Sequence, residues 1–211
     1  MPMNYVSPVT ASSALETSSR AAVVASLGRE APLPYAFDAL LNVKSGVRSV
    51  SDDRQCERFA HTLGLAQVGL VLRSVRLSGG RTVSLVAVPS ACWRDPVLHA
   101  RILDLKWARE LSGQRLLLVP ESVIRAEPQL TNALLVSACD GVHVTPRERL
   151  MLVSHLAEVG GSASLEVCAE ALTGSADPAG AVLRLVAERV LTIALARPID
   201  LQSEVSLAAW R

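Results

Sequence analysis

The sequence predicts an α/β domain with a small mixed sheet flanked by helices, followed by a smaller domain of three helices and a β-hairpin. Three observations support this prediction. Segments with helical periodicity alternate with β-branched runs over the first two thirds of the chain. Two of the β-branched runs flank a Ser-Gly-Gly turn. In the last third, three short helical segments precede two strand-like runs.

The first elements of the α/β domain follow an N-terminal arm, residues 1–48, which we expect to be partly irregular. A helix is predicted over Ser49–Leu65, with Ser51 as its N-cap and acidic residues in its first turn. The runs on either side of Ser78–Gly80 predict a β-hairpin. The second run, Val83–Val88, is nearly all apolar, which is typical of a strand covered on both faces.

The α/β domain continues with a helix that begins at Asp95-Pro96, where Asp is the cap and Pro occupies the first turn, and that ends at Gly113. Its predicted inner stripe comprises Leu98, Ile102, Leu105, Ala108 and Leu111. A buried strand over residues 115–120 and a further helix over residues 128–140 complete the domain. We expect the late strands to pair across the helical crossover.

The last domain, residues 145–211, begins with Thr-Pro-Arg-Glu, a complete capping box. Further short helices are predicted over Ser164–Leu172 and Asp177–Val190, and two strands surround Ala196–Pro198. Three helices followed by a two-stranded hairpin are typical of a winged helix-turn-helix domain. The chain is therefore expected to divide into the arm, an α/β domain over residues 49–144 and a winged-helix domain.

Composition limits the classes of partner. The 211-residue chain is 50% hydrophobic and has a net charge of +1, so it exerts no strong attraction on nucleic acid or on an anionic membrane. No apolar run reaches the roughly 18 residues of a membrane helix, and we expect no membrane partner. The four cysteines and four histidines lack the close pairing typical of zinc sites, so we expect no metal or other cofactor. Isolated thiols without a recognisable signal peptide predict a cytoplasmic protein.

The segment Trp107–Val136 resembles the core of TnsA-type transposon endonucleases. In that family a helix, a strand that ends in a Val-x-Glu-like turn, an Ile-Arg pair and a later Asn occur in this order. The corresponding parts of this chain are residues 107–111, residues 116–121, Ile124-Arg125 and Asn132. The resemblance extends over about Ser51–Leu207, and in many relatives a small winged-helix domain follows, as it does here.

This resemblance implies a restriction-endonuclease-like fold, whose active centre uses a glutamate on an early helix, an aspartate on a strand and a Glu-x-Lys or Gln-x-Lys strand. The carboxylates hold a divalent metal at the scissile phosphate. Glu57 is a candidate for the first position, but the strand over residues 70–77 carries only Arg73 and Arg76, and residues 83–88 carry no charge. Because phosphodiester cleavage needs charge neutralisation, we interpret the nuclease centre as lost.

A second set of residues keeps a nuclease alternative open. Asp95 and the run Asp104-Leu105-Lys106 match the spacing of a D…D-x-K motif, and with Glu57 they would form the centre of a divergent, Mg²⁺-dependent endonuclease. On a helix, however, Asp104 and Lys106 diverge by about 200°. We therefore favour a helix cap for Asp95 and a solvated helix face for the other two.

Nucleic-acid contacts are predicted to be weak. Residues 145–211 hold six basic and eight acidic residues, whereas strong DNA binders neutralise ~6–10 phosphates. The candidate contacts in this domain are Ser175, Arg184 and, on the wing, Arg197, for which surface solvation is the competing interpretation. On the predicted hairpin, Arg73, Arg76 and Arg81 either contact a nucleic-acid backbone or keep an exposed strand from pairing.

The leading hypothesis is a catalytically inactive nuclease-like protein. It would act as a DNA-associated or protein-interaction subunit of a mobile-element, phage or DNA-processing complex. Its expected partner is a protein or a second copy of the chain, with DNA held weakly. The alternatives are the divergent metal-dependent endonuclease and a winged-helix transcriptional regulator.

Overall fold

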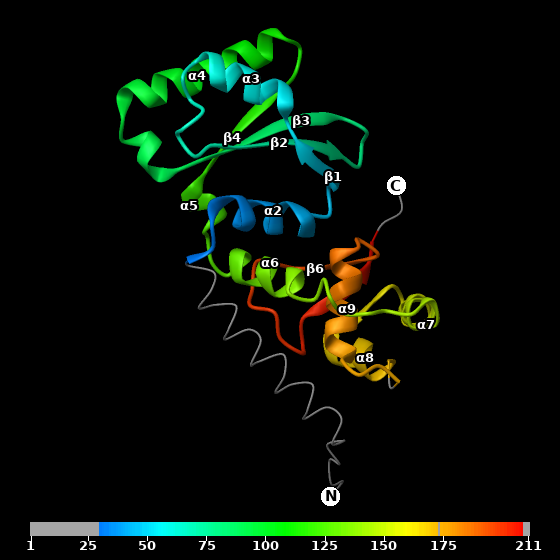
Figure 1. Cartoon of the computed structure of the whole chain (residues 1–211). Helices are drawn as coiled ribbons and strands as arrows, with labels where there is room; N and C mark the ends of the chain where they lie inside the picture. Colours follow the sequence, from blue (N-terminus) through cyan, green and yellow to red (C-terminus); the bar gives the residue numbers. More distant parts are fainter. Residues whose placement is uncertain (1–29, 173, 209–211) are drawn as a thin grey trace, which may run out of the picture. The chain divides into compact units, whose positions relative to one another are not determined.

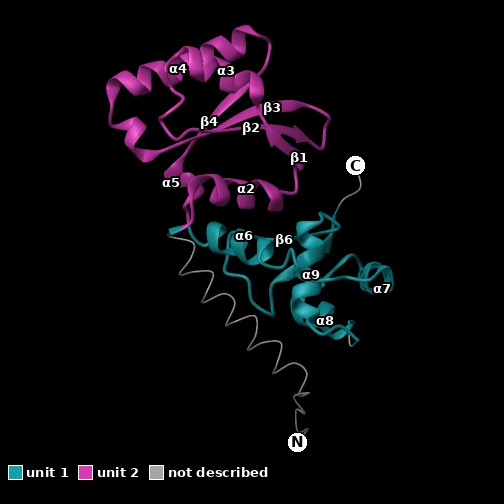
Figure 2. Cartoon of the chain, in the orientation of Figure 1, with its two compact units in different colours: residues 1–30, 127–211 teal, residues 31–126 magenta. Residues whose placement is uncertain are grey.

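The structure, a computed structural model, describes residues 30–172 and 174–208. The chain divides into two compact units (Figure 2). We call residues 31–126, magenta and marked unit 2 in the figure, the first unit. We call the other, teal and marked unit 1, the second unit; its described residues are Glu30, 127–172 and 174–208. The units divide at 30/31 and at 126/127, whereas the boundaries expected from the sequence lie at 48/49 and at 144/145. Within the described residues, none of the helices combines the length and the apolar character that a membrane-spanning segment needs.

The first unit is built on a four-stranded mixed sheet, as the sequence predicts. Its strands are β1 (Val47–Asp52), β2 (Val71–Leu77), β3 (Thr82–Val88) and β4 (Leu116–Pro120), which lie in the order β1-β2-β3-β4. The pairs β1/β2 and β2/β3 are antiparallel, and β3/β4 is parallel. The hairpin predicted between β2 and β3 and the parallel pairing across a helical crossover are both confirmed.

Helices cover both faces of this sheet (Figure 1). On one face lies α2 (Leu33–Val43), and on the other lie α3 (Arg54–Thr62) and α4 (Pro96–Leu111). A short 3-10 turn, Ser90–Trp93, precedes α4, and the four-residue helix α5 (Glu121–Ile124) follows β4.

An apolar core of this unit lies between the sheet and the pair α3 and α4. Its buried members are Cys56, Ala60, Leu65, Leu72, Val86, Val88, Cys92, Ile102, Leu105 and Leu116. The even-numbered residues of β2 and β3 face this core and the odd-numbered residues face α2, because side chains alternate along a strand.

The N-terminal part of this unit differs from the sequence-based expectation. Part of the expected arm is helix α2, which buries apolar side chains such as Phe37 and Leu40 against the sheet. Residues 49–52 form the end of β1 rather than the start of a helix, because they pair with β2 as far as Asp52 opposite Arg73. The N-cap of α3 is therefore Asp53, whose carboxylate accepts a hydrogen bond from the Cys56 amide, and Ser51 is not a cap.

The second unit combines four helices with a three-stranded antiparallel sheet among its described residues. Its elements are α6 (Gln129–Ser137), α7 (Pro146–Glu158), β5 (Ser162–Ser164), α8 (Leu165–Glu170), α9 (Pro178–Ala187), β6 (Leu191–Ile193) and β7 (Glu204–Leu207). The strands lie in the order β5-β7-β6.

Most elements of the second unit lie where the sequence predicts them. The capping box at the start of α7 is complete: Thr145 accepts from the Glu148 amide, and the Glu148 carboxylate accepts from the Thr145 amide. Strand β5 was not expected. Helix α6 was expected in the α/β domain, but it packs against α9. Five consecutive residues of α6, from Asn132 to Val136, are buried.

Candidate functional site

A buried ion pair joins the three elements of the first unit that meet on the α3–α4 face. Asp53 and Arg109 are only 4% and 2% exposed, and Nη2 of Arg109 lies 3.0 Å from both carboxylate oxygens of Asp53. The Ser84 hydroxyl of β3 donates to Oδ2 of Asp53 at 2.5 Å. Gln114 accepts from the same Nη2 of Arg109 at 2.5 Å. The start of α3, the middle of β3 and the end of α4 are thereby connected.

The surroundings favour the ionised form of Asp53. Burial acts to raise the pKa of Asp53, but hydrogen bonds from Ser84 and the Cys56 amide, together with Arg109, outweigh it and hold that pKa below 3.8. Burial, and then the Asp53 charge, raise the pKa of the neighbouring Cys56 thiol to about 12. Nε of Arg109 is buried and has no hydrogen-bond partner within the described residues. The cluster is closed to solvent and links α3, β3 and the end of α4, so we expect it to stabilise the fold.

Sequence reasoning missed this cluster, although one signal was present. Leu98, Ile102 and Leu105 line the inner side of α4, and Arg109 occupies the next position of the same stripe. A charged residue at a core position of a helix predicts a buried partner. Leu111, expected on the inner stripe, is instead 82% exposed.

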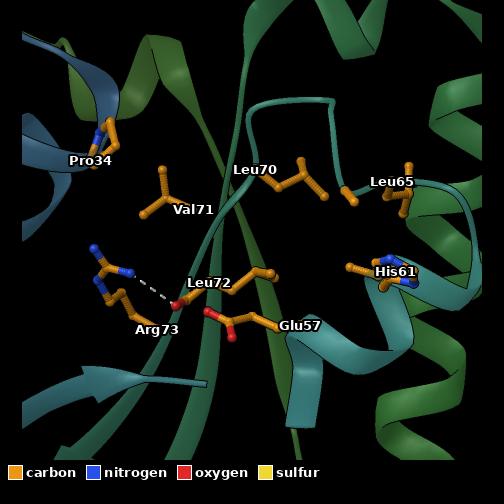
Figure 3. A pocket seen from close by; sticks show the side chains of 10 residues that line it. Pro34, Glu57, His61, Leu65, Leu70, Val71, Leu72 and Arg73 are labelled. Carbon is orange, nitrogen blue, oxygen red and sulfur yellow. Dashed lines mark hydrogen bonds between the residues drawn. The ribbon is translucent and has the colours of Figure 1, made fainter. Parts of the chain in front are cut away.

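A pocket of about 410 Å³ lies between α3 and the start of β2 (Figure 3). Its apolar lining comprises Pro34, Ala60, Leu65, Ala66, Leu70, Val71 and Leu72. Its polar lining consists of Glu57 and His61, which lie one helical turn apart, and Arg73 (Figure 3). The side chains of Glu57 and His61 form no hydrogen bond or salt bridge among residues 30–172 and 174–208. Glu57 is thus part of the pocket lining, but it is the single carboxylate among the described residues that line this pocket.

The other candidate nuclease residues do not join Glu57. Asp95 caps α4 and accepts hydrogen bonds from the amides of Val97 and Leu98. Asp104 is exposed on α4, and Lys106 lies 3.8 Å from Glu110 of the same helix. Within the described part of the chain, no group of three or more His, Cys, Asp or Glu side chains is placed to hold a metal ion.

The turn that carries the family resemblance connects distant segments of the first unit. Glu121 follows β4 and accepts hydrogen bonds from the Ser90 amide at 2.9 Å and from Nε of Arg125 at 2.7 Å. These bonds lower the pKa of Glu121. Arg125 also donates to the Ala31 carbonyl at 3.1 Å. The Glu and Arg of the motif thus tie the ends of β3 and β4 to the segment that precedes α2.

The structure separates the three hairpin arginines that the sequence placed in one basic patch. Arg73 faces α2, where it donates to both carboxylate oxygens of Asp38 at 2.8 and 2.9 Å, and it also pairs with Asp52. Its charge is therefore balanced within the unit. Arg76 lies on the opposite face of β2, and it is exposed, as is Arg81.

Little of α9, the helix that corresponds to the third helix of the predicted winged-helix domain, is available to nucleic acid. No residue of α9 is exposed, because α6, α8 and β6 pack around it. Arg184 pairs with Asp140 at 2.7 Å and with Glu188 at 3.0 Å. Ser175 is half-buried, and Arg197 is exposed in the segment between β6 and β7.

Asn132 of α6 fixes the segment between β6 and β7, which we call the wing after its predicted role. The sequence had not indicated any contact for Asn132. Its side-chain amide donates to the carbonyls of Leu195 and Arg197 at 2.9 and 2.6 Å. Its carbonyl oxygen accepts from the Ile199 amide at 3.1 Å. The later Asn of the family resemblance therefore holds the wing against α6.

Charge differs sharply between the two units. Residues 31–126 hold 13 Lys and Arg against 8 Asp and Glu, a net charge of +5. Residues 127–208 hold 5 Arg against 10 Asp and Glu, a net charge of −5. The near-zero charge of the whole chain conceals this separation.

Comparison with known proteins returned no match to a family model and no match among curated proteins.

Proposed function

We propose that the chain is a catalytically inactive, nuclease-like protein that acts as an interaction subunit of a DNA-processing complex of a mobile element or phage. In this proposal the first unit has the restriction-endonuclease-like fold and the second is a winged helix-turn-helix domain that binds protein. The mixed sheet flanked by helices and the resemblance of Trp107–Val136 to TnsA-type endonucleases support the first assignment. The order of the helices α7, α8 and α9 and of the strands β5-β7-β6 supports the second.

The observation that carries the proposal is the covering of α9. A winged-helix domain reads bases with the exposed side of its third helix. Here that helix has no exposed residue, and its one arginine is paired with two acids. A winged-helix domain whose third helix is covered is better suited to protein contacts than to base recognition. This argues against the alternative of a transcriptional regulator.

Electrostatics support the same assignment of roles. Residues 127–208 carry a net charge of −5, which repels the phosphate backbone, so this part of the chain adds no sequence-independent attraction. The first unit, with a net charge of +5 and exposed Arg76 and Arg81, is the part suited to a weak backbone contact. We therefore assign any DNA association to the first unit and the protein contacts to the second.

The scattered acids support the loss of catalysis. A metal-dependent nuclease needs at least two carboxylates that converge on one ion. Glu57 lies in the pocket, Asp95 is committed to a helix cap and Asp104 is exposed on another helix. These three carboxylates therefore do not converge on one position where a metal ion could bind.

The nuclease assay tests the catalytic part of the proposal. Incubation of the full chain with supercoiled plasmid and Mg²⁺ or Mn²⁺ is expected to give no more nicking than the Glu57→Gln and Asp104→Ala variants give. Electrophoresis of the plasmid measures the outcome. Cleavage by the wild type that disappears on either substitution would establish the divergent endonuclease instead.

A DNA-binding measurement tests the division of roles. We expect the full chain to bind a labelled duplex no more tightly than ordinary non-specific binders, with a Kd of about 10⁻⁶ M or weaker at physiological salt. The double substitution Arg76→Ala/Arg81→Ala should weaken this binding several-fold, whereas Arg184→Ala/Arg197→Ala should leave it within about twofold. Fluorescence anisotropy over a salt series provides the readout. If the second pair weakened binding more than the first, the winged-helix unit would be the DNA-binding part.

A further inference from the structure

The outward side of α4 carries a stripe of large apolar side chains. Trp107 is 70% exposed, Leu111 is 82% exposed and Leu103 is 43% exposed. At roughly 100° per residue, Leu103 and Leu111 lie about 40° to either side of Trp107, so the three share one face. Isolated exposed apolar residues need no explanation, but a tryptophan between two leucines on one helix face marks an interaction surface.

One flank of this stripe carries a pair of opposite charges. Lys106 and Glu110 lie 3.8 Å apart on the same side of α4. On the other flank, Nη1 of Arg101 lies 3.2 Å from the point that a Cβ on Gly64, in the turn that follows α3, would occupy, so this flank is directed toward the end of α3. The Lys106–Glu110 flank is therefore directed away from the neighbouring helix.

The stripe and the charge pair share one centre of symmetry. In an antiparallel pair of identical helices, a two-fold axis at position c brings residue n level with residue 2c − n of the other copy along the pair, and it keeps each side chain on its own flank of the interface. Leu103 and Leu111 are symmetric about position 107, which Trp107 occupies, and Lys106 and Glu110 are symmetric about position 108. A single axis near 107–108 therefore satisfies the apolar and the charged contacts together.

We propose that α4 pairs with α4 of a second copy of this chain. In this dimer Trp107 packs on Trp107 of the second copy, and Leu103 packs beside Leu111 of the second copy. Lys106 pairs with Glu110 of the second copy, and Glu110 with its Lys106. The inference is independent of the proposed function, because it uses no property of the second unit and no catalytic residue.

The composition of this face favours a second copy over other occupants. Lys106 and Glu110 on one flank and Arg101 and Asp104 on the other leave the face without net charge, so it exerts no particular attraction on phosphate. A self-complementary charge pattern is what an isologous interface requires, and a different protein would not need it. Since α4 has 16 residues, the contact is about 24 Å long. A single helix pair falls at the small end of specific interfaces, so we expect the dimer to dissociate at concentrations on the order of 10 µM.

Sedimentation of the full chain tests the dimer. Between about 1 and about 200 µM, the average mass should rise from 22.4 kDa toward twice that value. Trp107→Glu should remain monomeric throughout. Val123→Glu, which changes an equally apolar side chain that is 57% exposed on α5, should behave as the wild type. A wild type that stays monomeric, or a Trp107→Glu variant that still dimerises, would overturn the proposal.

A charge-swap experiment distinguishes contacts between copies from contacts within α4. Lys106→Glu and Glu110→Lys should each weaken self-association at least several-fold, because each places like charges opposite one another. Mixing the two variants should restore dimers, since each copy then faces the opposite charge. The mixture cannot restore the bond within one helix, so recovery reports on the interface alone. If the mixture associated no better than either variant by itself, the antiparallel arrangement would be wrong.

Discussion

Arg109→Met is expected to lower the free energy of unfolding by about 3–5 kcal/mol, because it leaves the Asp53 carboxylate buried without its cation. Methionine fits the apolar stripe of α4 that precedes this position, so loss of volume contributes little. Urea unfolding followed by circular dichroism measures the change. The double variant Asp53→Asn/Arg109→Met should recover much of the loss, since asparagine still caps α3 and no unpaired charge remains.

The ion pair between Asp52 and Arg73 provides a matched control. Asp52 directly precedes Asp53 in the chain. Because Asp52 is exposed, Asp52→Asn should lower the free energy of unfolding by at most about 1 kcal/mol. A loss below about 1 kcal/mol for Arg109→Met would mean that the buried pair does not clamp the fold.

The same pair has an expected signature in pH dependence. The folded-state pKa of Asp53 lies below its ordinary value of 3.8, so the unfolded chain binds the proton more readily than the folded chain. The stabilisation is therefore present above about pH 3.8 and is lost as the pH falls through the folded-state pKa. The double variant should lack this part of the acid dependence, which a series of urea titrations would show.

Much of the first unit could be predicted from the sequence, because its signals are local. Alternation and a Ser-Gly-Gly turn specify the β2–β3 hairpin, and an Asp-Pro pair specifies the start of α4. Local signals failed where pairing with a distant segment overrides them. Residues 49–52 look like a helix start, but they join β2 as a strand.

The buried ion pair and the contacts of Asn132 could not be predicted, because they join segments that are far apart in the sequence. Asp53 and Arg109 are 56 positions apart, and Asn132 reaches a wing more than 60 positions later. A polar residue at a core position indicates that some partner exists, but it does not identify that partner. For the same reason α6 was placed in the wrong unit: its apolar periodicity predicts a buried helix but not the helix α9 that covers it.

Asn132→Ala is expected to lower the stability of the second unit by about 2 kcal/mol. The substitution removes three hydrogen bonds to the wing and leaves the amide of Ile199, which is buried, without an acceptor. The wing should then open locally, and hydrogen exchange of the amides over residues 194–203 should accelerate by at least tenfold, the factor that about 1.4 kcal/mol gives. Mass spectrometry of deuterium uptake measures this directly.

Two further variants separate hydrogen bonding from packing. Asn132→Leu keeps the volume but not the bonds, so it should accelerate exchange in the wing as Asn132→Ala does. Thr131→Ala changes the neighbouring position of α6, whose side chain makes no bond to the wing within the described residues, and should leave exchange unchanged. If Asn132→Leu preserved the slow exchange, packing rather than the asparagine amide would hold the wing. If the wing opened and DNA affinity rose with it, the fixed wing would be what keeps this unit from binding nucleic acid.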